Sequence, residues 1–147
     1  MIRQMRECDI DDVYRITCES LDEPYVPEVF GFFLSQWASG QLVSVDNAGR
    51  IMGYISGSLP SFERASVMLF AVDPKFRGMG VGTKLIEALK MSAVMSGRYS
   101  VQLEVRSGSD AVSFYERRGF RQVGYSESFY NDGGSAIHMV SNATFNS

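Results

Sequence analysis

The sequence has few of the residues that build metal centres, disulfide frameworks or membrane spans. It contains two cysteines and one histidine, and Cys8 and Cys18 have no second pair with which to form a zinc cluster or a disulfide framework. No apolar run approaches the roughly 18 residues of a membrane helix, and "MIRQMRECDIDD" has no apolar core of a signal peptide. We therefore expect a cytoplasmic protein with reduced thiols, no metal and no membrane partner.

A surplus of positive charge is also missing. Lys and Arg number 14 against 17 Asp and Glu, which gives a net charge of −3. Non-specific binding to nucleic acid needs the opposite balance, so we expect no nucleic-acid partner. The 45% hydrophobic and 12% aromatic content is typical of a folded protein, and 147 residues suit one ordinary domain. The sequence predicts a single domain over residues 1–147.

The first third of the chain predicts a strand and two helices. Residues 2–6, "IRQMR", are typical of a short strand. A helix is then expected to begin at Asp9 or Asp12, either of which could cap it, and to stop before Pro24. A second helix is predicted over residues 28–38, because apolar residues recur there three and four positions apart.

The middle of the chain predicts a strand meander followed by a long helix. Residues 42–45 and 51–58 flank the turn "DNAGR", which is typical of a β-hairpin. Residues 66–72, "SVMLFAV", are almost wholly apolar, so we expect a central strand covered on both faces. Apolar residues then recur every four positions from Val81 to Gly97, which indicates a helix.

The last third predicts a strand, a short helix and a hairpin. "VQLEV" alternates, which places Glu104 on the polar face of its strand. A short helix is expected over residues 109–118, stopped by Gly119. "FRQVGYSESFY" and "SAIHMV" then flank "NDGG", a strong turn sequence. The order of elements predicts an α/β fold with a mixed sheet.

The stretch "DPKFRGMGVGTKL", residues 73–85, has the composition of a phosphate-binding loop. A Walker A loop ends in Gly-Lys-Ser/Thr, and a dinucleotide loop has a sixth-position glycine where this chain has Thr83. The spacing Arg/Gln-x-x-Gly-x-Gly/Ala is met by Arg77, Gly80 and Gly82. Such glycines let the backbone approach a pyrophosphate, and a helix start adds positive potential. The alternative interpretation is a flexible turn with an exposed arginine.

Two motifs now resemble the GNAT acetyltransferase superfamily. "VDPKFRGMGVGTKLI" is similar to its acetyl-CoA motif and "LEVRSGSDAVSFYERRGF" to its second motif, although no Asn stands between Arg106 and Ala111. "LDEPYVPEVF" and "FYNDGGSAIHM" narrow the resemblance to the ribosomal-protein and archaeal types of protein N-terminal acetyltransferase. The resemblance implies one GNAT-type domain, with a mixed, mostly antiparallel central sheet of about six or seven strands and about four flanking helices.

The resemblance also implies roles for particular residues. Tyr115 would protonate or hydrogen-bond the departing CoA sulfur, and Glu104 or Glu23 would take the amine proton. Tyr25 and Tyr130 would line the peptide entrance. Acetyl-CoA would bind without a metal at Phe70, Ala71, Val72, Arg77, Gly78, Met79, Gly80, Val81, Gly82 and Thr83.

Taken alone, several of these residues have a plainer interpretation. Tyr115 could be a core aromatic, and either glutamate could be a solvated surface carboxylate. His138 lies in an alternating strand and is interpreted as a structural histidine, while Phe30 and Trp37 are interpreted as core residues of the second helix.

We therefore expect direct acetyl transfer in a ternary complex to the α-amino group of a protein or peptide N-terminus. An α-amino group, with a pKa of about 8, is partly neutral at pH 7, whereas lysine near 10.4 is not, so a modest base suffices. Alternatives are a small amine such as a polyamine or amino sugar, a lysine side chain, and a non-catalytic acyl-CoA sensor. The sequence leaves the oligomeric state open, with a homodimer as one option.

Overall fold

A mixed sheet of seven strands runs through the protein, whose computed structural model describes residues 1–21 and 25–144. The strand order is β1-β2-β3-β4-β5-β7-β6. Only β4 and β5 are parallel, and the other neighbouring pairs are antiparallel. The strands are β1 (Ile2–Gln4), β2 (Gln41–Val45), β3 (Ile51–Ser58), β4 (Arg64–Val72), β5 (Ser100–Arg106), β6 (Arg121–Ser126) and β7 (Ala136–Asn142). The predicted mixed, mostly antiparallel sheet is confirmed.

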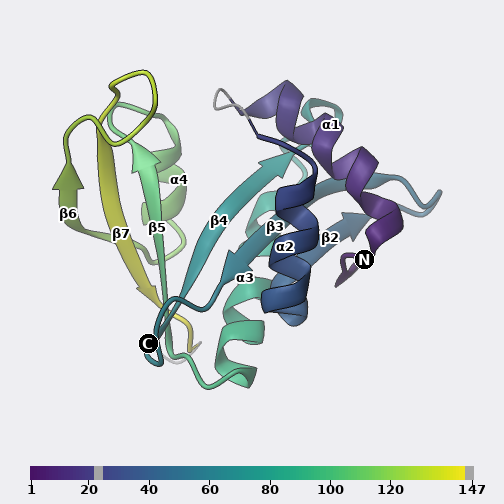
Figure 1. The fold of residues 1–147 in the computed structure, drawn as a ribbon, viewed down its shortest axis with the longest axis horizontal. Coiled ribbons are helices and arrows are strands. Elements are labelled where there is room, and N and C mark those ends of the chain that lie inside the picture. The colour runs from purple at the N-terminus through teal and green to yellow at the C-terminus, as the bar shows by residue number, and fades with distance from the viewer. Residues whose placement is uncertain (22–24, 145–147) are drawn as a thin grey trace.

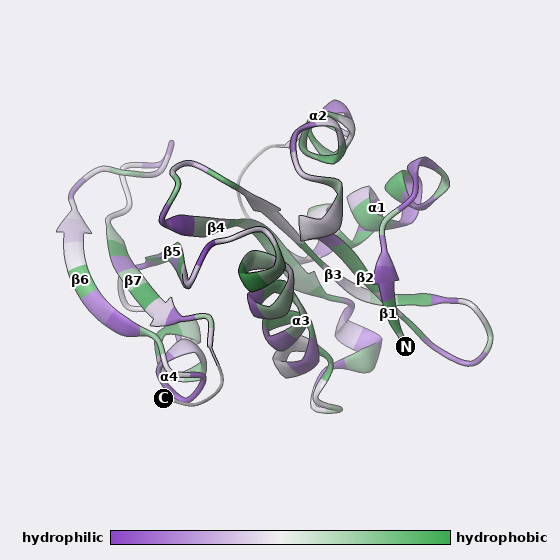
Figure 2. Cartoon of the chain, turned by 90° about the horizontal axis from the view of Figure 1, so that it is seen from below, coloured by the Kyte–Doolittle hydropathy of each residue, from purple (hydrophilic) through white to green (hydrophobic). Residues whose placement is uncertain are grey.

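Four α-helices cover the two faces of this sheet. They are α1 (Ile10–Ser20), α2 (Glu28–Gln36), α3 (Val81–Met95) and α4 (Ala111–Glu116). α1 and α2 lie on one face, and α3 and α4 lie on the other (Figures 1 and 2). Within residues 1–21 and 25–144, none of the helices combines the length and apolar character needed to cross a bilayer.

Each helical layer packs its own core against the sheet. On the α1 and α2 side, Phe30 meets Tyr54 edge to face at 5.5 Å, and the buried Tyr54 hydroxyl lies 2.6 Å from the Thr17 hydroxyl. On the other side, Leu85 and Leu89 of α3 are fully buried, as their four-residue spacing predicts. The central strands are therefore fixed from both faces.

The second helix is shorter than predicted. α2 ends at Gln36, and Trp37 leaves the helical conformation with φ −156° and ψ 81°. This turn sends the indole into the core on the α3 side, where Nε1 donates to Ser96 Oγ at 3.0 Å. Gly40 closes a 3₁₀ turn beneath the indole, and a Cβ there would lie 2.1 Å from the ring. The core roles predicted for Phe30 and Trp37 are confirmed.

β4 is central and contributes to the cores on both faces, as predicted, with Ala65 and Val67 in one core and Leu69 and Ala71 in the other; Met68 is the exception. The register of β4 with β3 shifts between Ser56 and Gly57, so that Met68 has no partner and forms a bulge. β4 pairs with β5 only over Arg64–Ser66. Figure 1 accordingly shows the two strands close at one end and far apart at their arrowheads. A bulge bends its strand, which here leaves Met68 46% exposed and opens the sheet.

The second predicted hairpin is formed by β6 and β7, which pair in antiparallel fashion. The strands stop well before the turn sequence, and residues 127–135 form a loop between them. "NDGG" turns at the tip of this loop, where Tyr130 N donates to Gly134 O at 3.0 Å and Gly133 N to Tyr130 O at 2.9 Å. Strong turn chemistry therefore shapes a long loop that lies beside the end of β5.

Candidate active site

A cavity of about 920 Å³ opens where β4 and β5 diverge. Most of the residues that the sequence predicts for the site line this one cavity. They are Tyr25, Phe70, Ala71, Val72, Arg77, Gly78, Gly80, Val81, Gly82, Thr83, Glu104, Tyr115 and Tyr130. Met79 is exposed and does not line it, and Glu23 lies outside the described residues.

The glycine loop leaves open space at the start of α3. Gly78 and Gly80 have φ values of +79° and +80°, and no atom lies within 4 Å of where a Cβ would stand at either position. Only glycine adopts this conformation readily. Gly80 is the N-cap of α3, so the first N–H groups of the helix have no partner within it. The loop thus presents positive dipoles to an uncrowded surface.

Gly82 serves packing more than backbone conformation. A Cβ at this position would lie 3.2 Å from the Phe70 ring and 3.3 Å from the Phe114 ring. These distances are tighter than ordinary van der Waals contact. Its lack of a side chain therefore lets α3 approach the aromatic wall of the cavity.

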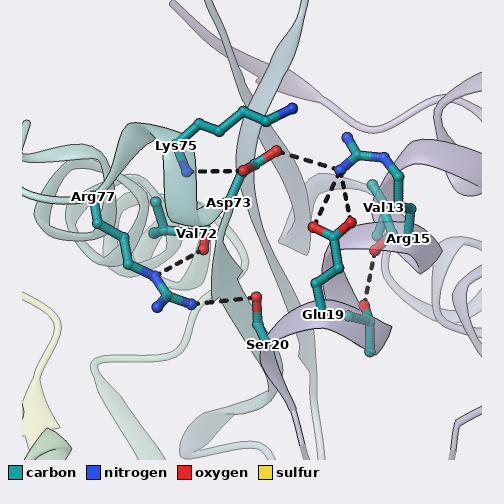
Figure 3. A network of polar contacts seen from close by, with 9 residues as sticks. Val13, Arg15, Glu19, Ser20, Val72, Asp73, Lys75 and Arg77 are labelled. Carbon is teal, nitrogen blue, oxygen red and sulfur yellow. Dashed lines mark hydrogen bonds and ion pairs between the residues drawn. The ribbon is translucent and has the colours of Figure 1, made fainter.

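Arg77 is tied to two elements beside the cavity, as Figure 3 shows. Its Nε donates to Val72 O at 3.3 Å and its Nη2 to Ser20 Oγ at 3.4 Å, which links the glycine loop to the end of α1. Next to it, Asp73 accepts from Lys75 N at 3.0 Å and lies 3.4 Å from Arg15. The Lys75 N–H, helped by Arg15, lowers the pKa of Asp73.

Tyr115 lines the cavity from within an aromatic cluster. Its ring centroid lies 5.4 Å from Phe114, 5.6 Å from Phe120 and 6.3 Å from Phe70. Burial is the main cause that raises the pKa of Tyr115, and the neighbouring Tyr130 raises it further. Tyr115 therefore packs within the cluster and lines the cavity, and its hydroxyl stays protonated at neutral pH.

Glu104 also lines the cavity, with 28% of its side chain exposed. It pairs in register with His138 on β7, and its Oε1 lies 3.4 Å from His138 Nδ1. The other histidine nitrogen, Nε2, lies 2.6 Å from Ser126 Oγ. Both ring nitrogens of His138 thus have partners, in agreement with its structural interpretation.

The rim of the cavity carries a contact that the sequence did not predict. Arg106 at the end of β5 lies 2.9 Å from Asp132 in the loop between β6 and β7. Its guanidinium also stands 4.3 Å from the centroid of the Tyr130 ring. Arg106 and Tyr130 both line the cavity, so the loop and β5 together shape its mouth.

Sequence reasoning also missed Arg118 and Ser109. Arg118 donates from Nε to Thr83 Oγ1 at 3.0 Å and lies 4.0 Å above the Phe114 ring. The four-residue spacing of Phe114 and Arg118 was a usable signal for that stacking. Ser109 lines the cavity in the segment that lacks the family's Asn, and its Oγ accepts from Ala111 N at 3.1 Å at the start of α4.

The described residues contain no group of three or more His, Cys, Asp or Glu side chains able to hold a metal. The cavity lining offers the Glu104 carboxylate, the phenols of Tyr25, Tyr115 and Tyr130, three arginines and the backbone dipoles of β4 and α3. These groups suit the transfer of a group whose carbonyl oxygen gains negative charge during the reaction.

Comparison with known proteins places this fold and site in one family. The Acetyltransferase (GNAT) domain family matches residues 25–143, and the chain belongs to this family of acetyltransferases. An N-alpha-acetyltransferase of Sulfurisphaera tokodaii is 31% identical over 153 residues, which cover 95% of this chain and 90% of that protein. An uncharacterized N-acetyltransferase of Methanocaldococcus jannaschii is 33% identical over 143 residues, again 95% and 90%.

A solved structure agrees with this family assignment. Ard1 from Thermoplasma volcanium is 34% identical, with a TM-score of 0.93 over 99% of this chain and 98% of that one. The family and fold expected from the two sequence motifs are confirmed.

Proposed function

We propose that this chain transfers an acetyl group from acetyl-CoA directly to the α-amino group of a protein or peptide N-terminus. One observation carries the proposal. A single cavity is lined by the glycine loop, by Glu104 and Tyr115, and by Tyr25 and Tyr130. The groups proposed to bind the donor, to carry out the reaction and to bind the acceptor therefore lie along one continuous surface. The names of similar proteins, among them the N-alpha-acetyltransferase of Sulfurisphaera tokodaii, support the α-amino acceptor.

The donor side fits a CoA thioester. The open space at Gly78 and Gly80 and the N–H groups at the start of α3 can hold a pyrophosphate, with Arg77 at its edge. Beyond Ser66, the edge of β4 that faces β5 is unpaired, so its backbone groups over Phe70–Val72 can bond the amides of a pantetheine arm. Acetyl-CoA supplies a thioester activated for attack by an amine.

Tyr115 is proposed to stabilise the departing sulfur. A phenol near pKa 10 is a weaker acid than a thiol near 8.5, and burial raises the pKa of Tyr115 further. Complete proton transfer to a well-solvated thiolate would be unfavourable. Within the partly buried aromatic cluster, the hydroxyl instead donates a hydrogen bond to the sulfur. The proton moves towards the sulfur only to the extent that the thiolate there is poorly solvated.

Glu104 is proposed to remove the proton of the amine, directly or through a water. Its carboxylate lines the cavity and is held towards His138 by a 3.4 Å contact, which restricts its rotamers. Because an α-amino group is partly neutral at pH 7, a base of ordinary strength suffices. Glu23 stays the alternative base. The assignment of residues 1–147 to one catalytic domain, the cytoplasmic location and a homodimer also stay predictions.

The proposal is tested by acetyl transfer from acetyl-CoA to three matched sets of acceptors. These are peptides with a free N-terminus, the same peptides with a blocked N-terminus and an internal lysine, and small amines such as a polyamine and an amino sugar. We expect turnover on the free N-termini and at least tenfold less on the other sets, because their amines are protonated at pH 7 or cannot fill the peptide entrance. Turnover on small amines alone would overturn the acceptor, and binding without turnover on any set would favour a sensor.

A further inference from the structure

A row of three polar side chains crosses the neighbouring strands β5, β7 and β6. Glu104 on β5 stands at one end, and its Oε1 lies 3.4 Å from His138 Nδ1 on β7. At the other end, Ser126 Oγ on β6 lies 2.6 Å from His138 Nε2. The three side chains thus form one chain of contacts, and Glu104 is its member that lines the cavity.

The register of the strands fixes this row. Glu104 and His138 are directly opposite each other, and on its other side His138 faces Gly124, which has no side chain to come between the ring and β6. Ser126 lies two residues beyond Gly124, hence on the same face and diagonal to His138. The His138 ring also stands at 85° to the Phe129 ring, with their centroids 5.9 Å apart. The imidazole is therefore held by both neighbouring strands and by the loop between β6 and β7.

These contacts agree with one arrangement of protons when Glu104 acts as a base. A carboxylate only accepts hydrogen bonds, so the proton of the neutral imidazole is assigned to Nδ1, which donates to Glu104. Nε2 is then an acceptor, and Ser126 Oγ donates to it. Because the serine satisfies Nε2 in this tautomer, Nδ1 presents a donor to Glu104.

Glu104 needs such an anchor. Its side chain is long and flexible, and 28% of it is exposed. Within residues 1–21 and 25–144, its only ion pair or side-chain hydrogen bond is the contact with His138. Contacts of this length at catalytic groups commonly tighten when substrate binds. A displacement of about 1 Å at a reacting group can lower the rate on the order of a hundredfold, so the anchor bears on the reaction.

We propose that His138 is a positioning residue for the reaction, which is oriented by Ser126 and holds the carboxylate of Glu104 in place to receive the proton of the acceptor amine. His138 is not among the residues that line the cavity, so it acts through Glu104. The inference rests on the proposed function, since it needs Glu104 to be the base. Loss of His138 should therefore lower kcat and leave KM for the acceptor nearly unchanged.

The test compares three substitutions of His138 that differ in where they leave a donor. His138→Leu removes both ring nitrogens. His138→Asn carries an amide nitrogen at the place of Nδ1, which can still donate to Glu104, whereas the amide of His138→Gln lies at the place of Nε2. Gln122→Leu is the control, because it makes a similar polar-to-apolar change at an exposed position of β6. The values of kcat and KM for a peptide acceptor are measured at pH 7 with saturating acetyl-CoA, together with the Tm of each variant.

We expect His138→Leu and His138→Gln to lower kcat about tenfold and His138→Asn no more than about threefold, with KM within about twofold throughout. Ser126→Ala should lower kcat about threefold, and Gln122→Leu should match the wild type. When Glu104→Gln is already present, His138→Leu should cause no further loss, because the group that it positions has been removed. If His138→Leu does not fold, His138→Gln takes its place in this comparison.

Three results would each overturn the inference and leave acetyl transfer to peptides standing. They are a kcat within twofold of the wild type for His138→Gln, equal losses for His138→Asn and His138→Gln, and the same fold loss with and without Glu104→Gln. A normal rate for Glu104→Gln would overturn both its role as base and this inference. If the wild type turns over no peptide, the proposed function itself fails.

Discussion

Arg106 and Asp132 join the end of β5 to the loop between β6 and β7. Arg106 Nη1 lies 2.9 and 3.0 Å from the two carboxylate oxygens of Asp132. Asp132 Oδ1 also accepts from Gly134 N at 2.9 Å, within the turn that carries Tyr130. Since Tyr130 lines the cavity, this ion pair positions one side of the proposed acceptor entrance.

Asp132→Asn should weaken acceptor binding without affecting the donor. The amide keeps an oxygen for Gly134 N but loses the charge that faces Arg106, so the loop is held less firmly. We expect the KM for a peptide acceptor to rise about two- to fivefold, the modest effect of an exposed ion pair. The dissociation constant of acetyl-CoA should not change.

Asp46→Asn is the matched control, because Asp46 accepts from backbone N–H groups and pairs with Arg50 in the hairpin between β2 and β3. It should leave both constants unchanged. An unaltered peptide KM in Asp132→Asn would show that the loop does not shape the acceptor site.

Tyr115→Phe should lower kcat by about a hundredfold while leaving the fold intact. The phenyl ring keeps the contacts with Phe114, Phe120 and Phe70 and removes only the hydroxyl. Acetyl-CoA affinity and Tm should therefore stay close to those of the wild type. The control is Tyr125→Phe, which removes an exposed hydroxyl from β6. A kcat within twofold of the wild type would show that Tyr115 contributes only packing and that its hydroxyl takes no part in the reaction.

Glu104→Gln and Glu23→Gln decide between the two candidate bases. If Glu104 is the base, its variant should lose at least tenfold in kcat/KM at pH 7, and Glu23→Gln should lose much less. The loss should shrink above about pH 8, where the α-amino group is neutral without help. Rates are measured from pH 6.5 to 9.5, with the exposed Glu116→Gln as a control. If Glu23→Gln loses more kcat/KM than Glu104→Gln, Glu23 is the general base.

Local patterns were sufficient to predict most of the fold. The four-residue repeat from Val81 fixes the buried face of α3, and the alternation of "VQLEV" buries Val101, Leu103 and Val105. Both signals come from residues close together in the sequence. The bulge at Met68 was not predictable in the same way, because it arises from the register of β4 with β3. An almost wholly apolar strand carries no period that could reveal it.

The residues of the candidate site likewise divide into those predictable from local spacing and those that depend on tertiary packing. The Arg77, Gly80 and Gly82 spacing is local and pointed to a pyrophosphate loop, whereas Arg118 reaches Thr83 only because α4 packs beside α3. Gly82 illustrates a mixed case. Its position in the motif was predictable from the sequence. The requirement for glycine comes from the closeness of Phe70 and Phe114, which depends on the packing of three elements.

The N-terminal turn depends on an ion pair with a clear pH signature. Asp9 was predicted as a possible cap of α1, but its side chain makes no bond to that helix. It accepts instead from Arg3 at 2.7 and 3.0 Å and from the N–H of Arg6 at 2.8 Å, with 8% of the side chain exposed. The hydrogen bonds from Arg3, followed by the Arg6 N–H, hold the pKa of Asp9 below its ordinary value.

Asp9→Asn should therefore destabilise the protein by about 1–3 kcal/mol at pH 7, because two charge-assisted bonds are lost from a buried group. A carboxylate whose pKa is lowered by folding contributes its full stability above the unfolded pKa, near 3.9, and loses it as the pH falls through the folded pKa. The gap between wild type and variant should thus be constant from pH 7 to 5 and close below about pH 4. Urea unfolding at pH 7, 5 and 3 measures it, with the exposed Asp12→Asn as a control that should show almost no gap. A gap of the same size at pH 3 would mean that shape, and not charge, accounts for the contribution of Asp9.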